Sequence, residues 1–215
     1  STLFPYTTLF RSPYSRYGRA ATLSFHATKL FHTVEGGAVV TDDDALADRI
    51  RRMRSFGQDE PDTIADLGVN GKNSELHAAM GLALLSRIDE VIGARKAICE
   101  AYDAALRGLP VRYPAIPAET TRNFAYYPML LRSEAEMMAV RTALTAAGIA
   151  TRRYFHPPLN LLPYVTSPPM PVAEDAARRV LCLPLFVGLE LNAVRAIADI
   201  VAAALESRSR LKATT

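Results

Sequence analysis

Short apolar segments alternate with helical segments along this chain, and this alternation limits the folds that are open to it. Apolar runs of strand type lie at 21–25, 38–41, 125–131, 149–155 and 180–186. Apolar residues recur at helical spacing at 45–56, 74–106, 133–147, 173–179 and 191–207. Strand and helix patterns that alternate in this way are typical of the α/β class. We therefore predict an α/β protein.

The helix predicted over 74–106 divides the chain into two parts. Ser74 or Asn73 can cap its start, and Gly108-Leu109-Pro110 is a sequence that ends a helix. A helix of about 30 residues spans about 45 Å, which is long enough to connect two domains. We predict a first domain that ends in this interdomain helix, then an α/β domain of about 100 residues and a disordered tail, over 13–107, 108–207 and 208–215. The family resemblance given below implies that the first of these is only part of a larger domain.

Composition and charge place the chain among ordinary globular proteins. Of its 215 residues, 49% are hydrophobic and 22% are charged, which excludes disorder as its main character. The net charge is only +3 and the charged residues are scattered, so we expect neither nucleic acid nor a membrane as a partner. The two cysteines, Cys99 and Cys182, lack the spacing of metal ligands. We therefore expect reduced thiols, no metal site and a cytoplasmic location.

The first twelve residues, STLFPYTTLFRS, fit neither a signal peptide nor a recognisable strand or helix. Residues 2–12 match, at every position, the conceptual translation of a common sequencing-adapter oligonucleotide. We interpret 1–12 as a sequencing artefact joined to a truncated gene, so that the authentic chain begins near Pro13. The alternative interpretation is a natural apolar arm at the N-terminus.

The densest group of polar residues follows the first predicted strand. It reads SFHATK at 24–29, and the paired glycines Gly36 and Gly37 come shortly afterwards. Lys29 at the end of a strand, with the hydroxyl group of Ser24 five residues before it, could serve as a Schiff-base amine beside a phosphate or carbonyl ligand. The alternative is an exposed loop lysine, because lysine side chains are rarely buried.

Two longer strings contain this group and the region after it. They are SFHATKLFHTVEGGAVVTDDDALADRIRRMRSFG at 24–57 and GVNGKNSELHAAMGLALLSRID at 68–89. The strings resemble the pyridoxal-phosphate-dependent sugar aminotransferases of the DegT/DnrJ/EryC1/StrS family, with softer cues in TRRYFHPPL at 151–159 and LCLPLFVGL at 181–189. The resemblance implies a fold-type I transferase: the C-terminal part of a large cofactor-binding domain, followed by a small C-terminal α/β domain.

The resemblance also implies roles for three residues. Lys29 matches the lysine that forms a Schiff base with pyridoxal 5′-phosphate and then moves a proton during the reaction. Ser24 matches a hydroxyl group that bonds the cofactor phosphate. Asn70 matches an asparagine that reaches the phosphate in the partner subunit's site, which implies a homodimer with shared active sites.

The reaction implied by the resemblance transfers an amino group to a nucleotide-linked keto-sugar. The expected donor is L-glutamate, and a dTDP-4-keto-6-deoxyhexose is an example of the acceptor. Such enzymes serve nucleotide-sugar and polysaccharide biosynthesis. The rival interpretation is a non-catalytic cofactor-binding or regulatory member of the same fold, and the presence of Lys29 argues against it, because a site that forms no imine needs no amine. An aldolase without a cofactor is disfavoured, because Ser24 and Asn70 would then have no phosphate to bind.

Four residues are weaker candidates for substrate contacts: His26, Lys72, Tyr154 and His156. His26 flanks Lys29 together with His32, and these histidines could relay protons or only orient the loop through hydrogen bonds. Lys72 could contact the substrate nucleotide or be a solvated loop charge. Tyr154 and His156 could line the sugar pocket or pack within a turn.

Two departures from the family pattern bear on these expectations. Asn73 stands where the pattern has Met. Before the lysine motif, relatives carry a phosphate-binding loop, a residue that stacks on the pyridine ring and an acidic partner of the pyridine nitrogen, and none of these has a counterpart here. We therefore expect that the parent protein is an aminotransferase and that this fragment alone is inactive.

Overall fold

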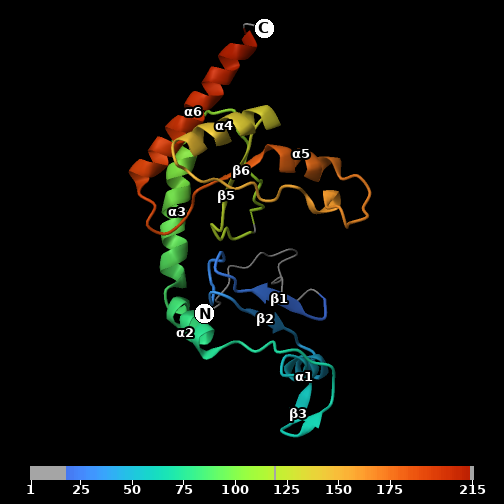
Figure 1. Ribbon diagram of the computed structural model, residues 1–215. Helices are drawn as coiled ribbons and strands as arrows, with labels where there is room; N and C mark the ends of the chain where they lie inside the picture. The colour runs from blue at the N-terminus through green and yellow to red at the C-terminus, as the bar shows by residue number, and fades with distance from the viewer. Residues whose placement is uncertain (1–17, 119, 214–215) are drawn as a thin grey trace. The chain divides into compact units, whose positions relative to one another are not determined.

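The computed structural model describes residues 18–118 and 120–213, which form two compact units (Figure 1). Of the described residues, unit 1 contains 18–91, 116–118 and 120–123, and unit 2 contains 92–115 and 124–213. Residues 1–12, which we interpret as adapter sequence, lie outside the described ranges. Helices and strands occur in both units, in agreement with the α/β prediction. The domain limits predicted from the sequence stay a prediction.

Unit 1 begins with an antiparallel hairpin. Strand β1 (Ala21–Ser24) pairs with β2 (Gly37–Val40), so that Ser24 lies opposite Gly37. Helix α1 (Asp44–Met53) follows, and the Asp43 carboxylate caps it by accepting the Leu46 N–H group at 3.0 Å. Two short strands, β3 (Gln58–Glu60) and β4 (Thr63–Ile64), form a second antiparallel hairpin.

The structure contains two helices where we predicted one over 74–106. Helix α2 (Glu75–Leu85) is capped by Ser74, and helix α3 (Ile88–Ala105) follows it. The Ser86 hydroxyl group donates to the Ala83 carbonyl at 3.3 Å, and the Arg87 N–H group donates to Leu84 at 3.0 Å, so a turn closes α2. Acidic residues in the first turn of α3 favour a new helix start there. The apolar spacing continues across the turn, which is why the sequence does not reveal the break.

Unit 2 is built on the antiparallel pair of β5 (Tyr127–Leu130) and β6 (Val180–Leu183). Its helices are the later part of α3, α4 (Glu134–Ala146), α5 (Pro171–Arg179) and α6 (Leu191–Ala213), with a short 3-10 helix at Leu159–Leu161. Helix α6 continues past its predicted end at 207. The strand predicted over 149–155 is wrong, because only Arg152 pairs with β6, through a single bridge to Cys182. Farther along, prolines at 157 and 158 lack N–H donors and cannot take part in a ladder.

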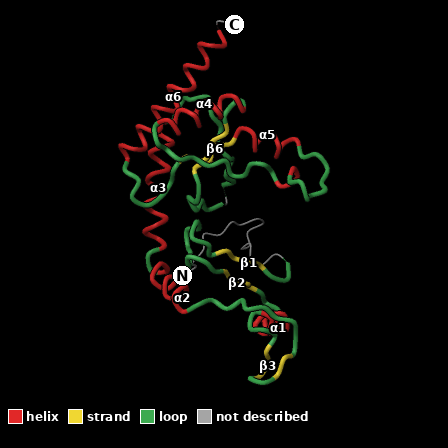
Figure 2. The backbone as a smooth tube through the Cα atoms, viewed as in Figure 1, coloured by secondary structure: helices red, strands yellow, loops and turns green. Residues whose placement is uncertain are grey.

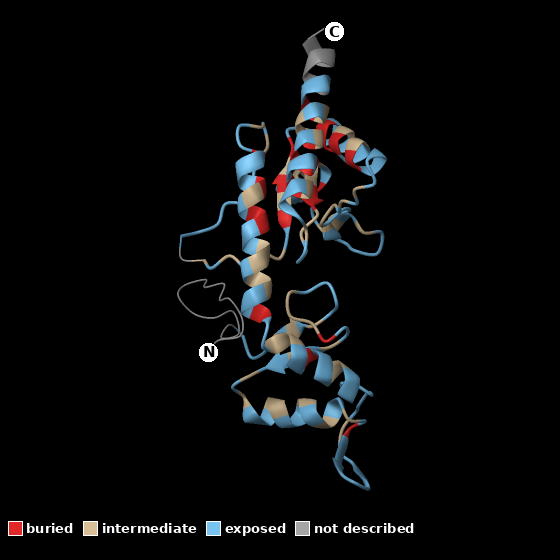
Figure 3. Ribbon diagram, turned by 90° about the vertical axis from the view of Figure 1, so that its left-hand side faces the viewer, coloured by how far each residue is buried: buried red, intermediate tan, exposed pale blue. Residues whose placement is uncertain are grey.

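The hydrophobic core found among the described residues lies in unit 2, where α3, α4, α6 and the two strands contribute buried side chains (Figure 3). Tyr102 and Tyr127 stack near its centre with ring centroids 4.7 Å apart. Both hydroxyl groups are satisfied: Tyr102 donates to the Pro184 carbonyl at 3.0 Å and Tyr127 to Asp103 at 2.7 Å. Burial raises the pKa of both tyrosines, because the phenolate would lose its hydration.

Unit 1 leaves most of its large apolar side chains in contact with solvent. Leu67, Leu76 and Leu82 are 86%, 84% and 72% exposed, and among the described residues of this unit Ile88 is the one large hydrophobic side chain that is buried. Nothing in the described ranges is a helix long and apolar enough to cross a membrane.

Candidate active site

Lys29 lies in the loop 25–36, which connects β1 to β2 (Figure 2). Backbone hydrogen bonds close the base of this loop. The Phe25 N–H group donates to Gly36 at 2.8 Å, and the Thr33 N–H group donates to Phe25 at 2.9 Å. The Lys29 N–H group donates to the His26 carbonyl at 2.9 Å, which forms a turn over 26–29. The loop therefore has a defined backbone, while the Lys29 side chain is exposed.

Thr33 anchors the loop against α2. It is 5% exposed, and its hydroxyl group donates to the Glu35 carbonyl at 2.7 Å. A Cβ atom on Gly81 of α2 would lie 2.9 Å from the Thr33 methyl group, and one on Gly36 would lie 2.2 Å from the Thr33 oxygen. These two glycines let the helix and the loop approach each other closely.

Ser24 ends β1, five residues before Lys29. Its side chain lies on the exposed face of the strand, on the same face as Thr22, while Leu23 points to the other face. A Cβ atom on Gly37, opposite Ser24, would lie 2.8 Å from the Leu23 carbonyl oxygen, so a glycine is needed at this point of the hairpin. The Ser24 hydroxyl group is thus presented to solvent at the edge where the lysine loop begins.

Both histidines of the loop bond to its backbone. Nδ1 of His26 accepts the Thr28 N–H group at 3.2 Å and lies 2.8 Å from the Thr28 hydroxyl oxygen. On its other side, Nε2 of His26 lies 3.4 Å from the Glu35 carboxylate. Nδ1 of His32 accepts the Val34 N–H group at 3.3 Å. These are the loop hydrogen bonds that an orienting role requires, and the choice between that role and a proton relay stays a prediction.

Asn70 and Lys72 lie in a segment whose backbone is hydrogen-bonded to the end of α1. The Val69 N–H group donates to Met53 at 2.7 Å, the Phe56 N–H group to Val69 at 3.1 Å and the Gly71 N–H group to Arg54 at 2.8 Å. Asn70 pairs with Ser55 in an isolated antiparallel bridge. The backbone of 69–71 is therefore fixed by α1, and Asn70 has an exposed side chain.

Phe56 positions the ammonium group of Lys72. The Nζ atom lies 4.0 Å from the centroid of the Phe56 ring, which is the geometry of a cation–π contact. Phe56 has a positive φ of 60° and is 49% exposed, so its ring is available as a platform. Lys72 is therefore more ordered than a fully solvated loop charge.

A pocket of about 810 Å³ in unit 1 has Lys72, one of the predicted site residues, in its wall. The wall is formed by β1, the end of the lysine loop, β2, one face of α1 and the segment that follows Asn70. The charged groups in it are Glu35, Arg51, Arg54 and Lys72, so cations outnumber carboxylates. The Arg54 side chain has no hydrogen-bond or ion-pair partner among the described residues. The pocket therefore favours an anionic ligand.

The same pocket includes Asn73, the residue that departs from the family pattern, and His77. The Asn73 side-chain oxygen lies 3.1 Å from where a Cβ atom on Gly36 would be, so this segment contacts the end of the lysine loop. Among the described residues, Ser24, Lys29 and Asn70 are outside the pocket wall. The structure thus brings Lys72 and the end of the lysine loop into one pocket wall. Ser24, Lys29 and Asn70 are exposed outside that wall.

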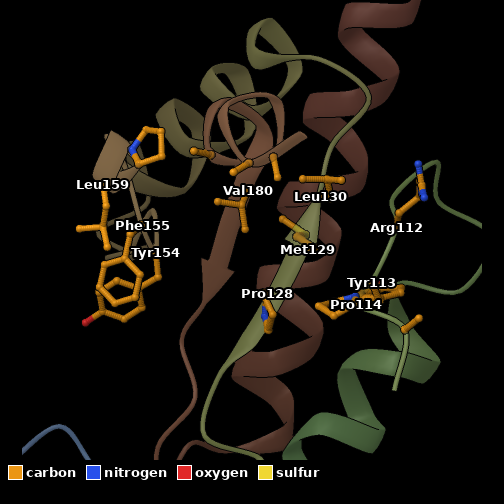
Figure 4. A pocket seen from close by; sticks show the side chains of 15 residues that line it. Arg112, Tyr113, Pro114, Pro128, Met129, Leu130, Tyr154, Phe155, Leu159 and Val180 are labelled. Carbon is orange, nitrogen blue, oxygen red and sulfur yellow. The ribbon is translucent and has the colours of Figure 1, made fainter. Parts of the chain in front are cut away.

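Tyr154 and His156 belong to unit 2. Tyr154 lines an apolar pocket of about 540 Å³, in which Tyr154, Phe155 and Leu159 lie on one side and Tyr113 and Pro114 on the other (Figure 4). The Tyr154 hydroxyl group accepts a hydrogen bond from Arg152, and its ring stacks edge-on against Tyr126 at 5.0 Å. His156 is exposed and is not in the pocket wall.

Three residues near the site have no signal in the sequence: Glu35, Arg54 and Phe56. Glu35 meets His26 because the loop folds back on itself, through a turn in which Val34 has a positive φ of 66°. Arg54 belongs to an arginine run whose pattern is typical of a solvated helix face. Phe56 meets Lys72 only because the stem returns to the end of α1.

Comparison with known proteins assigns the family. The sequence profile of the DegT/DnrJ/EryC1/StrS aminotransferase family matches residues 11–202. The chain belongs to this family. It is 32% identical over 193 residues to a dTDP-4-amino-4,6-dideoxy-D-glucose transaminase of Shigella dysenteriae, with 86% of the chain and 53% of the relative covered. It is also 32% identical over 180 residues to a GDP-perosamine synthase of Caulobacter vibrioides, with coverages of 80% and 48%.

Solved structures of the family share the fold. The crystal structure of DesI with its TDP-sugar product gives a TM-score of 0.81 at 37% identity and covers 94% of this chain and 55% of that one. The aminotransferase TlmJ from Streptoalloteichus hindustanus gives 0.84 at 28% identity, with coverages of 92% and 55%. These matches confirm the predicted family and fold class. The chain spans about half the length of the curated relatives it matches.

The residues of the lysine loop fit the cofactor of this family, pyridoxal 5′-phosphate. This cofactor carries an aldehyde, which needs an amine, and a phosphate, which needs hydrogen-bond donors. Lys29 offers an exposed amine with no ion-pair partner among the described residues, and Ser24 offers an exposed hydroxyl group on the adjoining strand end. The lysine loop and its strand therefore offer an amine that can react with the aldehyde and a hydroxyl group that can donate a hydrogen bond to the phosphate.

Proposed function

We propose that this family member transfers an amino group to the keto group of a nucleotide-linked sugar, with pyridoxal 5′-phosphate held at Lys29. The observation that carries the proposal is the Lys29 amine on a loop with a fixed backbone, five residues after Ser24, in a chain whose relatives include named nucleotide-sugar transaminases. Because the chain spans about half the length of these relatives, the proposal concerns the full natural protein. That the 215-residue chain alone is inactive stays a prediction.

Each residue would have one task. When bound, pyridoxal 5′-phosphate supplies an electron sink that stabilises negative charge at the substrate carbon. Lys29 binds the aldehyde carbon through Nζ, and the same nitrogen, once released, holds and moves a proton. The Ser24 hydroxyl group donates to the phosphate. Asn70 donates to a phosphate in a partner subunit's site, which is the reason to propose a homodimer.

The excess of cationic side chains in the pocket of unit 1 favours the proposal that the substrate is anionic. Lys72 is held in place over Phe56, and the Arg54 side chain lies in the same wall without a partner among the described residues. These groups suit the phosphates of a nucleotide-linked sugar. We propose further that Tyr154 and His156 contact the sugar. The proposed amino donor is L-glutamate, and a dTDP-4-keto-6-deoxyhexose is an example of the proposed acceptor. The proposed location of the protein is the cytoplasm.

The test is the first half-reaction in the full natural protein. L-glutamate is added to the protein loaded with pyridoxal 5′-phosphate, and the visible absorbance of the bound cofactor is followed. We expect the absorbance to disappear as pyridoxamine 5′-phosphate forms, and Lys29→Ala to abolish the change. Lys96→Ala is the matched control, because Lys96 is an exposed lysine of α3 that pairs with Glu100 at the surface. A cofactor that is bound at Lys29 but never converted would instead favour a non-catalytic member of the family.

A further inference from the structure

Lys29 is flanked by two histidine rings that make the same unusual contact. Nδ1 of His26 faces the Thr28 N–H group at 3.2 Å, and Nδ1 of His32 faces the Val34 N–H group at 3.3 Å. A backbone N–H group can only donate, so each Nδ1 atom must accept and cannot carry a hydrogen. In a neutral imidazole the hydrogen is then on Nε2. The loop geometry thus selects one tautomer of both rings.

The surroundings of His26 support the same tautomer. Nε2 lies 3.4 Å from the Glu35 carboxylate, which accepts hydrogen bonds, and the Thr28 hydroxyl group lies 2.8 Å from Nδ1, where it can donate. Glu35 is the charged group that faces this ring at ion-pair distance. The ring therefore bonds the Thr28 backbone through Nδ1 and turns Nε2 toward the Glu35 carboxylate.

His26 controls the turn that carries Lys29 from both ends. Its carbonyl accepts the Lys29 N–H group at 2.9 Å, and its ring accepts the N–H group of Thr28, the residue before Lys29. An asparagine or aspartate in an Asx turn bonds the backbone in the same way, two residues on. Nδ1 is thereby committed to the backbone of the turn as an acceptor, so this atom does not pass protons to Lys29 in this arrangement.

We propose that His26 is a positioning residue for Lys29. Its ring carries a hydrogen on Nε2 and fixes the 26–29 turn by accepting the Thr28 N–H group at Nδ1. The proposal rests on the function proposed for Lys29, and it goes beyond that function by assigning the histidine an acceptor role rather than a proton relay.

Two substitutions separate these roles. In His26→Asn the side-chain oxygen can still accept the Thr28 N–H group, but no imidazole remains to carry protons. In His26→Leu a side chain of similar bulk has no acceptor. A positioning role predicts that His26→Asn keeps the hydrogen bond to Thr28 and the reactivity of Lys29, which His26→Leu loses. A proton relay predicts that Lys29 loses reactivity in both variants.

The first measurement needs no cofactor. Long-range proton–nitrogen NMR correlations of the imidazoles in the full chain, at neutral pH, show which nitrogen carries the hydrogen, and only four histidines need assignment. We expect the Nε2–H form for His26. We also expect amide hydrogen exchange of Thr28 to be about fivefold faster in His26→Leu, as for the loss of one hydrogen bond, and to be restored in His26→Asn. His32→Leu is the control, because it should accelerate exchange at Val34 and not at Thr28.

The second measurement follows covalent attachment of pyridoxal 5′-phosphate to Lys29 after borohydride reduction. We expect His26→Asn to be labelled within about twofold of the wild-type rate and His26→Leu to be about fivefold slower. An Nδ1–H tautomer, or equally slow labelling of the Asn and Leu variants, would overturn the positioning role. If wild-type Lys29 is never labelled, the proposed function fails, while the tautomer and exchange data still test the hydrogen bond by itself.

Discussion

Gly57 and Gly68 cross at the base of the loop that leads to Asn70, and neither position has room for a β-carbon. A Cβ atom on Gly68 would lie 2.0 Å from the Gly57 nitrogen, and one on Gly57 would lie 1.8 Å from the Asp66 carbonyl oxygen. Gly57 also has a positive φ of 77°, a conformation that glycine adopts without strain. This crossing sets the position at which the chain returns to α1 and presents Asn70 and Lys72.

The first prediction concerns this crossing. Gly68→Ala forces the backbone apart, and we expect a loss of about 1–3 kcal/mol in local stability, together with faster amide exchange at Val69 and Gly71. Gly93→Ala is the control, since a β-carbon on this residue of α3 would meet no atom within 4 Å. That change should stabilise the protein by about 0.5–1 kcal/mol. Equal effects of the two substitutions would show that the crossing is not tight.

The second prediction concerns the start of α4. The Ser133 hydroxyl group accepts the Glu136 N–H group at 3.2 Å, while the buried Glu136 carboxylate accepts from the backbone and side chain of Arg132. Ser133→Ala removes the cap and should lower the free energy of unfolding by about 1 kcal/mol in chemical denaturation. Thr142→Ala, at an exposed position of the same helix, should change it by less than about 0.5 kcal/mol. A neutral Ser133→Ala would contradict the capping role.

The third prediction concerns two tyrosines. Tyr127→Phe removes the hydrogen bond to Asp103 and should destabilise unit 2 by about 1 kcal/mol, because the core loses one satisfied hydroxyl group. Tyr164→Phe is the matched control, since that side chain is 81% exposed, and it should have no measurable effect on unfolding. The hydrogen bond is unimportant if the two variants unfold at the same denaturant concentration.

The fourth prediction concerns pH. Hydrogen bonds from the Met170 N–H group and the Asn160 amide lower the pKa of Glu174 below its ordinary value of about 4.3. A lowered pKa in the folded state stabilises the protein above about pH 4.3, and this stabilisation is lost as the pH falls through the folded-state pKa. Glu174→Gln keeps an acceptor oxygen but cannot titrate. The free energy of unfolding, measured between about pH 3 and pH 6, should therefore rise less steeply with pH in this variant than in the wild type. The same pH dependence in both proteins would contradict the lowered pKa of Glu174.

The sequence was informative where local patterns decide the structure. The strands around the lysine loop, the caps at Ser74 and Ser133 and the position of Lys29 after β1 all follow from spacing and residue type. The break at Ser86 was not visible, because one turn interrupts the helix without disturbing the apolar spacing.

The candidate site was less predictable, because its contacts join residues through folded turns. Glu35 reaches His26 across a turn with a positive φ at Val34, and Phe56 reaches Lys72 across a loop closed by two glycines. Neither pairing leaves a periodic signal. Spacing drew attention to Lys29 and the resemblance to the family proposed its role, but neither could identify the groups that hold it and its neighbours in place.

The most direct test asks whether Lys29 is the residue that binds pyridoxal 5′-phosphate. The chain has four lysines, Lys29, Lys72, Lys96 and Lys212, so peptide mass spectrometry can locate the cofactor after borohydride reduction. We expect the label on Lys29 to exceed that on each other lysine by about tenfold, the ratio given by about 1.4 kcal/mol of preference, and to be lost in Lys29→Ala. Equal labelling of all four lysines, or a label elsewhere that Lys29→Ala leaves unchanged, would contradict the assignment.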